Sequence, residues 1–142
     1  HRATVLAVEA AHLVPMYKDA GTPWKVEKLY YTAFPKAEFV RMVAMAKAAG
    51  MDPPFGEEDP ENMEFLTPDE YVTTSIDTVS VIDRKREALR AHRSQISADW
   101  PQLTMPDEAL RAFADAHFQL AMSRTPAVLP ETDLFAGVTP EA

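Results

Sequence analysis

The sequence predicts an α/β domain in which helices pack on a small mixed sheet. Residues 25–34 (KVEKLYYTAF) and 71–82 (YVTTSIDTVSVI) are rich in β-branched and aromatic side chains, which favour strands. Residues 35–50, between them, predict a helix, because Pro35 suits a first turn and Gly50 suits the left-handed cap after a last turn. The bulky residues of the first strand are nearly continuous, so we expect both of its faces to be covered.

Three more helices are predicted from apolar residues at helical spacing. Residues 2–17 combine this spacing with many alanines. Residues 83–96 begin at Asp83, a capping residue type, and residues 105–124 carry acidic residues in their first turn. His117 falls on the apolar face of this last helix, where we expect a core histidine with satisfied hydrogen bonds.

The 83–96 helix carries the most informative polar residues. Leu89, His92 and Ile96 recur at i, i+3 and i+7 and form its apolar face. Gln95 follows His92 by three positions, so the two side chains can share a site. Spacing alone leaves two alternatives open for His92, a buried residue bonded to a backbone carbonyl or a member of a binding site. The basic residues of the same helix predict a solvated face.

Two segments predict irregular structure. Residues 51–70 hold four prolines and eight acidic residues, which predicts a long exposed loop. Long loops in compact domains are often lids, so a flap over a ligand site is the alternative. The tail after residue 124 is punctuated by prolines, and we expect Leu134 and Phe135 to dock it on the body of the domain.

Composition excludes several classes of function. The 142 residues predict one domain, and 14 Lys and Arg against 22 Asp and Glu give a net charge of −8. This charge argues against a nucleic-acid or anionic-membrane surface. The absence of cysteine excludes disulfides, thiolate metal sites and a cysteine nucleophile, and is compatible with a cytoplasmic location. No apolar run approaches the roughly 20 residues that a membrane-spanning helix needs.

No complete catalytic motif is present in the chain. The spacings of zinc-binding histidine motifs are absent, as are the glycine-rich and serine-nucleophile motifs, and only four glycines occur in total. The sequence opens inside a helical pattern without a preceding cap, which is typical of a fragment. If the chain belongs to an enzyme, we therefore expect it to be an incomplete one.

Three stretches together resemble a known family. WKVEKLYYTAFPKAEF, then IDTVSVIDRKREALRAHRSQI, then ETDLFAGV, are similar to the C-terminal portion of PIG-L/LmbE-type zinc deacetylases. This family includes N-acetylglucosaminyl-phosphatidylinositol de-N-acetylase, the mycothiol-pathway deacetylase and mycothiol-conjugate amidase. The resemblance covers residues 1 to about 138 and implies a part of a Rossmann-like fold.

The resemblance also implies where a site would lie. In the family, an A-H-P-D-D-E motif supplies two zinc ligands and the carboxylate base, and the last histidine of an H-P-D-H motif supplies the third ligand. His1 corresponds to that histidine, whereas the first motif is absent from this sequence. The end of the 83–96 helix approaches the cleft in the family, which implies that Gln95 and His92 lie near the substrate.

The expected function is therefore zinc-dependent hydrolysis of an N-acetyl group on an N-acetylglucosaminide. Zn²⁺ would be the cofactor, a small N-acetyl sugar the substrate, and the missing N-terminal part of the same enzyme a partner. No catalytic residue is assigned within the chain, and homo-oligomer formation is left open. The alternative is a non-catalytic binding or interaction module that retains the C-terminal fold of the family.

Overall fold

A three-stranded antiparallel sheet forms the centre of the computed structural model, which describes residues 2–14, 16, 18–53 and 59–139. The strands are β1 (Lys28–Ala33), β2 (Thr74–Ile76) and β3 (Ala116–Ser123), and their order in the sheet is β1-β3-β2. β3 pairs with both neighbours, Tyr31 with Gln119 on one side and Ser75 with His117 on the other. The latest strand in the chain is therefore the one that holds the sheet together.

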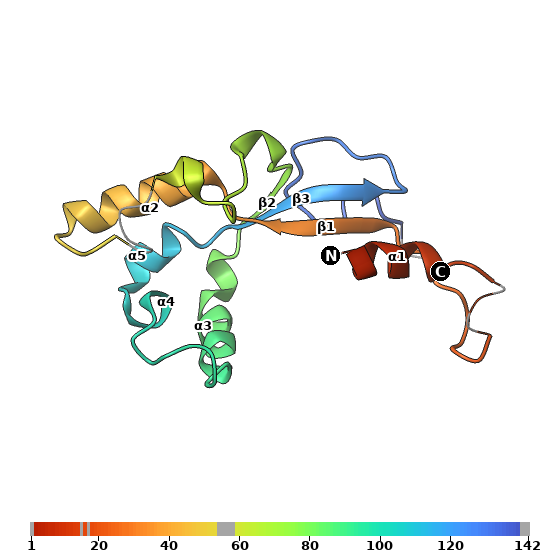
Figure 1. The fold of residues 1–142 in the computed structure, drawn as a ribbon, viewed down its shortest axis with the longest axis horizontal. Coiled ribbons are helices and arrows are strands. Elements are labelled where there is room, and N and C mark those ends of the chain that lie inside the picture. The colour runs from red at the N-terminus through yellow and green to blue at the C-terminus, as the bar shows by residue number, and fades with distance from the viewer. Residues whose placement is uncertain (1, 15, 17, 54–58, 140–142) are drawn as a thin grey trace.

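The helices are divided between the two ends of this sheet (Figure 1). α2 (Lys36–Ala48) and the group of α3 (Ile82–Ala91), α4 (Pro101–Thr104) and α5 (Asp107–Arg111) lie at one end, whereas α1 (Arg2–Ala10) lies beside β1 at the other. Short 3₁₀ turns complete the described elements, at Pro60–Asn62, Asp69–Tyr71 and Val79–Val81. None of the described helices has the length and apolar character that a membrane crossing requires.

The predicted α/β class is confirmed, and the arrangement is compatible with part of a Rossmann-like fold. The strands themselves pair antiparallel. Parallel pairing is found in two isolated bridges, Pro35 with Thr67 and Thr74 with Glu131. The sheet was expected to be mixed, and among the residues that the structure describes the parallel pairing is limited to these two bridges.

One element type was predicted wrongly. The helix expected over residues 105–124 ends at Arg111, and the remainder of that stretch becomes β3. Its residues have enough helix propensity to fit a helical pattern, but β1 and β2 both present hydrogen-bonding edges to it. Pairing with two strands outweighs propensity differences of less than about 1 kcal/mol per residue. His117 consequently lies in the sheet and not on a helix.

Several element boundaries also differ from prediction. α1 ends at Ala10, seven residues before the predicted end, and a turn follows in which Leu13 N–H donates to the carbonyl of Ala10. The strand predicted over residues 71–82 is interrupted because Asp77 Oδ1 accepts from Val79 N–H over 2.8 Å. Such local bonds from an aspartate side chain favour a turn over a continuing strand.

The apolar core consists of two small clusters at the helical end of the sheet. One joins Phe39 of α2 to Met63 and Leu66, and the other joins Ile82, Leu110 and Ala114. Met63 and Leu66 are buried, so this part of the 51–70 segment packs on the domain and is not a solvated loop. Residues 54–58 of the segment lie outside the described residues, and its role as a flap stays a prediction.

The tail docks differently from the prediction. Leu134 is half-buried, but the side chain of Phe135 is 74% exposed, so the expectation that Phe135 anchors the tail was wrong. The anchor is instead Glu131, a charged residue that is 3% exposed. A polar contact therefore holds a segment for which an apolar contact was expected.

Candidate functional site

The predicted substrate-proximal residues lie at the end of α3. The helix ends at Ala91, and His92 follows with φ −81° and ψ 47°, outside helical geometry. Gln95 N–H donates to the carbonyl of His92 over 2.9 Å, which places the two residues in one turn. Both side chains are exposed, so the inward-facing apolar position predicted for His92 was wrong.

The predicted metal ligand cannot be placed in the structure. His1 lies outside the described residues. Within residues 2–14, 16, 18–53 and 59–139, no group of three or more His, Asp or Glu side chains could hold a metal ion. Zinc sites need at least three protein ligands around one point. The described residues therefore do not fit a zinc site, and the zinc expected from the resemblance stays a proposal.

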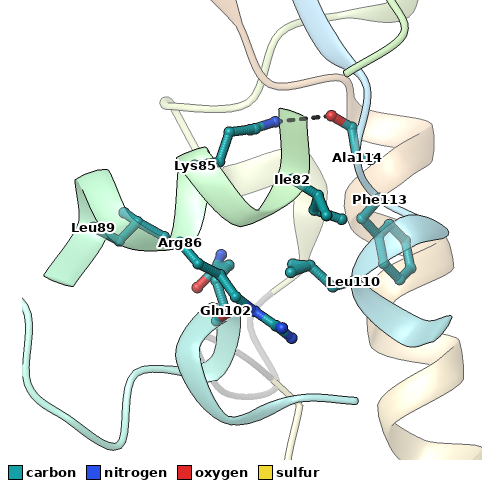
Figure 2. Close-up of a pocket in the computed structure, with 8 residues that line it drawn as sticks. All are labelled: Ile82, Lys85, Arg86, Leu89, Gln102, Leu110, Phe113 and Ala114. Carbon is teal, nitrogen blue, oxygen red and sulfur yellow. Dashed lines mark hydrogen bonds between the residues drawn. The ribbon is translucent and has the colours of Figure 1, made fainter. Parts of the chain in front are cut away.

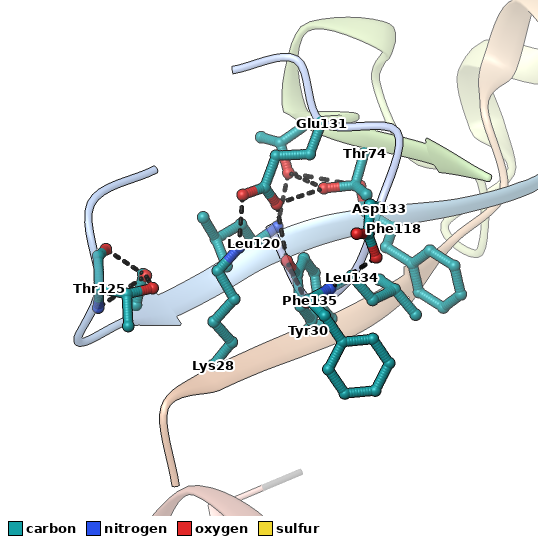
Figure 3. A network of polar contacts seen from close by, with 12 residues as sticks. Lys28, Tyr30, Thr74, Phe118, Leu120, Thr125, Glu131, Asp133, Leu134 and Phe135 are labelled. Carbon is teal, nitrogen blue, oxygen red and sulfur yellow. Dashed lines mark hydrogen bonds and ion pairs between the residues drawn. The ribbon is translucent and has the colours of Figure 1, made fainter. Parts of the chain in front are cut away.

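A buried polar network on one face of the sheet was not foreseen (Figure 3). The Glu131 cluster consists of Lys28, Tyr30, Thr74 and Glu131. Lys28 Nζ lies 2.5 Å from Glu131 Oε1, and the Tyr30 hydroxyl donates to Glu131 Oε2 over 2.6 Å. Thr74 Oγ1 donates to the same oxygen over 3.2 Å. The side chains of Lys28 and Glu131 are 4% and 1% exposed, so this ion pair is shielded from water.

The backbone of the same residue joins the tail to β2. Ser75 N–H donates to the carbonyl of Glu131 over 3.0 Å, and Glu131 N–H donates to the carbonyl of Thr73 over 2.9 Å. The Tyr30 hydroxyl also lies 3.3 Å from the carbonyl of Leu134. Glu131 therefore connects the tail to β1 through its side chain and to β2 through its backbone.

The charges of this cluster stabilise one another. Burial opposes ionisation of Glu131, but hydrogen bonds from Lys28 and Tyr30 outweigh it and lower the pKa of the carboxyl. Burial likewise opposes the charged form of Lys28, yet the hydrogen bond to Glu131 raises the pKa of the ammonium overall. Burial and the Glu131 carboxylate together raise the pKa of Tyr30. The polar groups of these four side chains bond one another, so the cluster is a structural network.

A second polar series lies on β2, β3 and α2. Ser75 Oγ is 2.9 Å from Nδ1 of His117, and Nε2 of His117 is 2.6 Å from Oε2 of Glu38. Glu38 is also 3.7 Å from Arg41, whose Nη2 donates to the carbonyl of Ala112 over 2.7 Å. In a series of this kind the imidazole can accept the proton of the hydroxyl, and the carboxylate holds the ring in its orientation. The expected satisfied histidine is confirmed at His117, although on a strand.

A small cavity lies among α3, α4 and α5 (Figure 2). Its volume is about 200 Å³, and it is lined by Ile82, Lys85, Arg86, Leu89, Gln102, Leu110, Phe113 and Ala114. Sites for small molecules usually occupy about 300 Å³ or more, so it is small for an amino sugar linked to a second ring. Lys85 Nζ donates to the carbonyl of Ala114 over 2.8 Å, and Arg86 Nη2 donates to the carbonyl of Met105 over 2.8 Å. Arg86 is half-buried and links α3 to the residue after α4, whereas Arg84, Lys85 and Arg90 are exposed, as predicted for this basic face.

The sequence indicates that two members of the Glu131 cluster share a strand face, but it does not indicate that Glu131 contacts them. Lys28 and Tyr30 are two positions apart in a predicted strand and so share a face. Glu131 begins the ETDLFAGV stretch, but nothing in its spacing indicates that it meets β1, about one hundred residues earlier in the chain. Only the tertiary arrangement brings these residues together.

The chain is similar in sequence to proteins that are named as deacetylases. No protein-family model matches the chain. It is 38% identical over 142 residues to a protein of Acidothermus cellulolyticus named 1D-myo-inositol 2-acetamido-2-deoxy-alpha-D-glucopyranoside deacetylase, covering 97% of this chain and 45% of that protein. Proteins of the same name from Rhodococcus jostii and Geodermatophilus obscurus are 38% and 32% identical, over 97% of this chain and 48% of each relative. The chain thus spans about half the length of the curated relatives it matches.

Proposed function

We propose that this chain forms part of a PIG-L/LmbE-type deacetylase that hydrolyses the N-acetyl group of an N-acetylglucosaminyl inositol. The observation that carries the proposal is the 38% identity to the Acidothermus deacetylase along 97% of the chain. In this reaction water adds to the acyl carbon, the C–N bond breaks, and the products are acetate and a free amine. The α/β fold is compatible with this assignment.

In this proposal, two zinc ligands and the general base come from the part of the longer protein that this chain does not include, and the third ligand is His1. Metal-assisted hydrolysis requires a ligand set that the described residues do not supply. No reaction step is therefore assigned to a residue of this chain. The ligand role of His1, a cytoplasmic location and homo-oligomer formation remain predictions.

In this proposal, the chain forms part of the enzyme domain and supplies side chains that contact the substrate. His92 and Gln95 are exposed in one turn, so an imidazole and an amide are free of the core at that point. Side chains of these types donate and accept hydrogen bonds and suit the hydroxyl groups of a sugar. We therefore propose that Gln95, together with His92, contacts the sugar.

A chimeric enzyme tests the function. In the chimera, this chain replaces the stretch of the Acidothermus relative that it matches, and acetate release from 1D-myo-inositol 2-acetamido-2-deoxy-α-D-glucopyranoside is measured with added Zn²⁺ and with a chelator. We expect hydrolysis that the chelator abolishes. The intact relative is the positive control, and the 142-residue chain alone should release no acetate. A folded chimera that is inactive beside an active relative would sink the proposal.

The same chimera tests the substrate contact. Replacement of an amide that bonds the sugar should raise KM, so we expect Gln95→Ala to raise KM several-fold and Gln95→Asn to recover part of the loss. Arg93→Ala, at another exposed position of the same turn, is the matched control and should leave KM unchanged. An unaltered KM in Gln95→Ala would remove Gln95 from the site. Sugar binding by the chain alone without hydrolysis would instead favour a binding module.

A further inference from the structure

A cavity at the helical end of the sheet combines apolar walls with one polar group that lacks a partner. It lies among α3, α4 and α5 and has a volume of about 200 Å³ (Figure 2). The apolar side chains that line it are Ile82, Leu89, Leu110, Phe113 and Ala114. Three of them, Ile82, Leu110 and Ala114, are the buried residues of the second core cluster. One side of the cavity is therefore packed core, whereas Leu89 and Phe113 are only half-buried.

The polar group without a partner is the side-chain amide of Gln102. Its Oε1 atom is buried and accepts no hydrogen bond from any residue that the structure describes. In Figure 2 this side chain extends from α4 toward α3. Buried acceptors are nearly always paired in native folds, because an unpaired one has lost its bonds to water without replacement. A bound group that donates to Oε1 would restore the missing bond.

The two basic side chains at the cavity are already engaged. Arg86 forms an ion pair with Asp107, and its remaining nitrogens donate to backbone carbonyls. Lys85 Nζ donates to the carbonyl of Ala114 over 2.8 Å and to a threonine hydroxyl over 2.9 Å. A cationic ligand would meet two like charges here, and an anion would find the guanidinium already paired. The lining therefore favours a neutral molecule.

The volume of the cavity sets the size of that molecule. In another protein, an apolar cavity of about 150 Å³ stays dry and takes up benzene. A cavity of about 200 Å³ thus has room for one aromatic ring with a small substituent. Water is a poorer filling, because a buried water needs two to four polar partners and most of these walls are apolar.

We propose that this cavity binds a small neutral molecule made of one aromatic ring and one hydroxyl group, a phenol or an aryl alcohol. The ring would lie against Leu89, Leu110 and Phe113, and the hydroxyl would bond the amide of Gln102. A hydroxyl both donates and accepts, so it suits either orientation of the amide. Phe113 is held in place for this contact, since the guanidinium of Arg41 lies 4.7 Å from the centroid of its ring.

The cavity is distinct from the turn that is proposed to contact the sugar. Neither His92 nor Gln95 lines it. The inference therefore goes beyond deacetylation and does not depend on it. Because Leu89 and Gln102 are half-buried, we expect the ligand to enter beside them without unfolding of the core.

Titration of the ¹⁵N-labelled 142-residue chain with phenol and with toluene tests the proposal. The two probes have nearly the same size and differ in the hydroxyl group. We expect phenol to shift the amide signals of Ile82, Leu89 and Leu110 saturably, with a dissociation constant in the millimolar range or below. Gln102→Leu should weaken phenol at least about tenfold, because the hydroxyl is then buried without a partner. The affinity for toluene should not fall in this variant.

Two further variants serve as controls. Arg84→Ala, at an exposed position of α3 that does not line the cavity, should leave both affinities unchanged. Leu89→Trp should abolish binding of both probes, because the larger side chain fills the cavity. Shifts that never saturate would mean that the cavity holds water only and would overturn the proposal. Equal affinities for phenol in the parent and in Gln102→Leu would also overturn it.

An independent measurement covers the case in which Gln102→Leu does not fold. Nuclear Overhauser effects between the ring protons of phenol and the methyl groups of Ile82 and Leu110 should then locate the ring in the cavity of the parent chain. Their absence at saturating phenol would overturn the proposal.

The chimera described above shows whether the cavity stays open in the longer protein. Calorimetric titration of the chimera with phenol should give an affinity similar to that of the 142-residue chain. Loss of binding in a folded chimera would mean that the rest of the polypeptide covers the cavity, which would overturn the proposal. Acetate release is measured separately, so a chimera that binds phenol but does not hydrolyse its substrate would refute only the proposed function.

Discussion

α1 and the tail, residues 124–139, both lie near β1, yet they are held in opposite ways. α1 is a regular helix without a buried residue, whereas the tail has no helix or strand and contains Glu131, one of the most buried side chains of the described residues. Glu131 bonds Lys28, Tyr30 and Thr74 and bridges β2 through its backbone. Regular secondary structure and attachment to the rest of the fold are therefore separate properties of a segment. Attachment depends on which polar and apolar groups leave water.

The largest effect should come from breaking the ion pair that holds the tail. We expect Glu131→Gln to destabilise the chain by about 3 to 5 kcal/mol, because it leaves the Lys28 ammonium buried without its counter-charge. Urea unfolding at neutral pH measures the change. The double variant Lys28→Met/Glu131→Leu should recover most of the loss, since it removes both charges together. A single variant as stable as the parent would show that the tail is not held by this pair.

The pH dependence of stability should come next in size and should reflect both partners. The pKa of Glu131 lies below its ordinary value of 4.5, so its contribution is complete above that pH and is lost as pH falls through the lowered pKa. The pKa of Lys28 lies above its ordinary value of 10.5, so its contribution is complete below that pH and is lost as pH rises through the raised pKa. Tyr30, with a raised pKa, acts in the same direction as Lys28.

Thermal unfolding across this range measures the effect. We expect a plateau between about pH 5 and pH 10, with Tm falling on both sides. The double variant Lys28→Met/Glu131→Leu is the control, and its profile should be flatter at both ends because the linked groups are gone. Identical profiles for parent and double variant would contradict the linkage.

A glycine in the tail should give the third effect. Gly137 has φ +77°, and a Cβ there would lie 2.5 Å from the carbonyl oxygen of Pro126. We expect Gly137→Ala to cost about 2 kcal/mol or more, from the left-handed conformation together with this contact. Gly50, with φ +69° and open space around it, is the matched control. Gly50→Ala should cost only about 1 kcal/mol in the same unfolding assay, and equal costs would mean that the tail does not pack as described.

The smallest effect is expected in α1. Leu6→Ala should change the stability of the 142-residue chain by no more than about 0.5 kcal/mol, because its side chain is already largely in water. Phe39→Ala removes a side chain that is 1% exposed and should cost about 3 to 5 kcal/mol. If the two substitutions cost the same, α1 is packed more closely in solution than in this structure.

The sequence predicted local elements better than their assembly. α2 was predicted almost to the residue, because its limits depend on Pro35 and Gly50, which act locally. The region of β1 was predicted for a similar reason. β3 was not, because a strand between two others is specified by partners that are distant in the chain. A helix was predicted as far as residue 96, but the turn that contains His92 and Gln95 is not helical. The prediction failed because no glycine or proline marks the end of the helix in the sequence.

By itself, the sequence determined the α/β class, the acidic charge, the absence of cysteine chemistry and the resemblance to PIG-L/LmbE-type deacetylases. These properties depend on composition, on periodicity and on short stretches that can be recognised without contacts. The tertiary structure decided that β3 is the central strand, that His117 bridges Ser75 and Glu38, and that Glu131 is the buried anchor of the tail. Each of these depends on groups far apart in the chain, whose approach is governed by desolvation and pairing that no local pattern records.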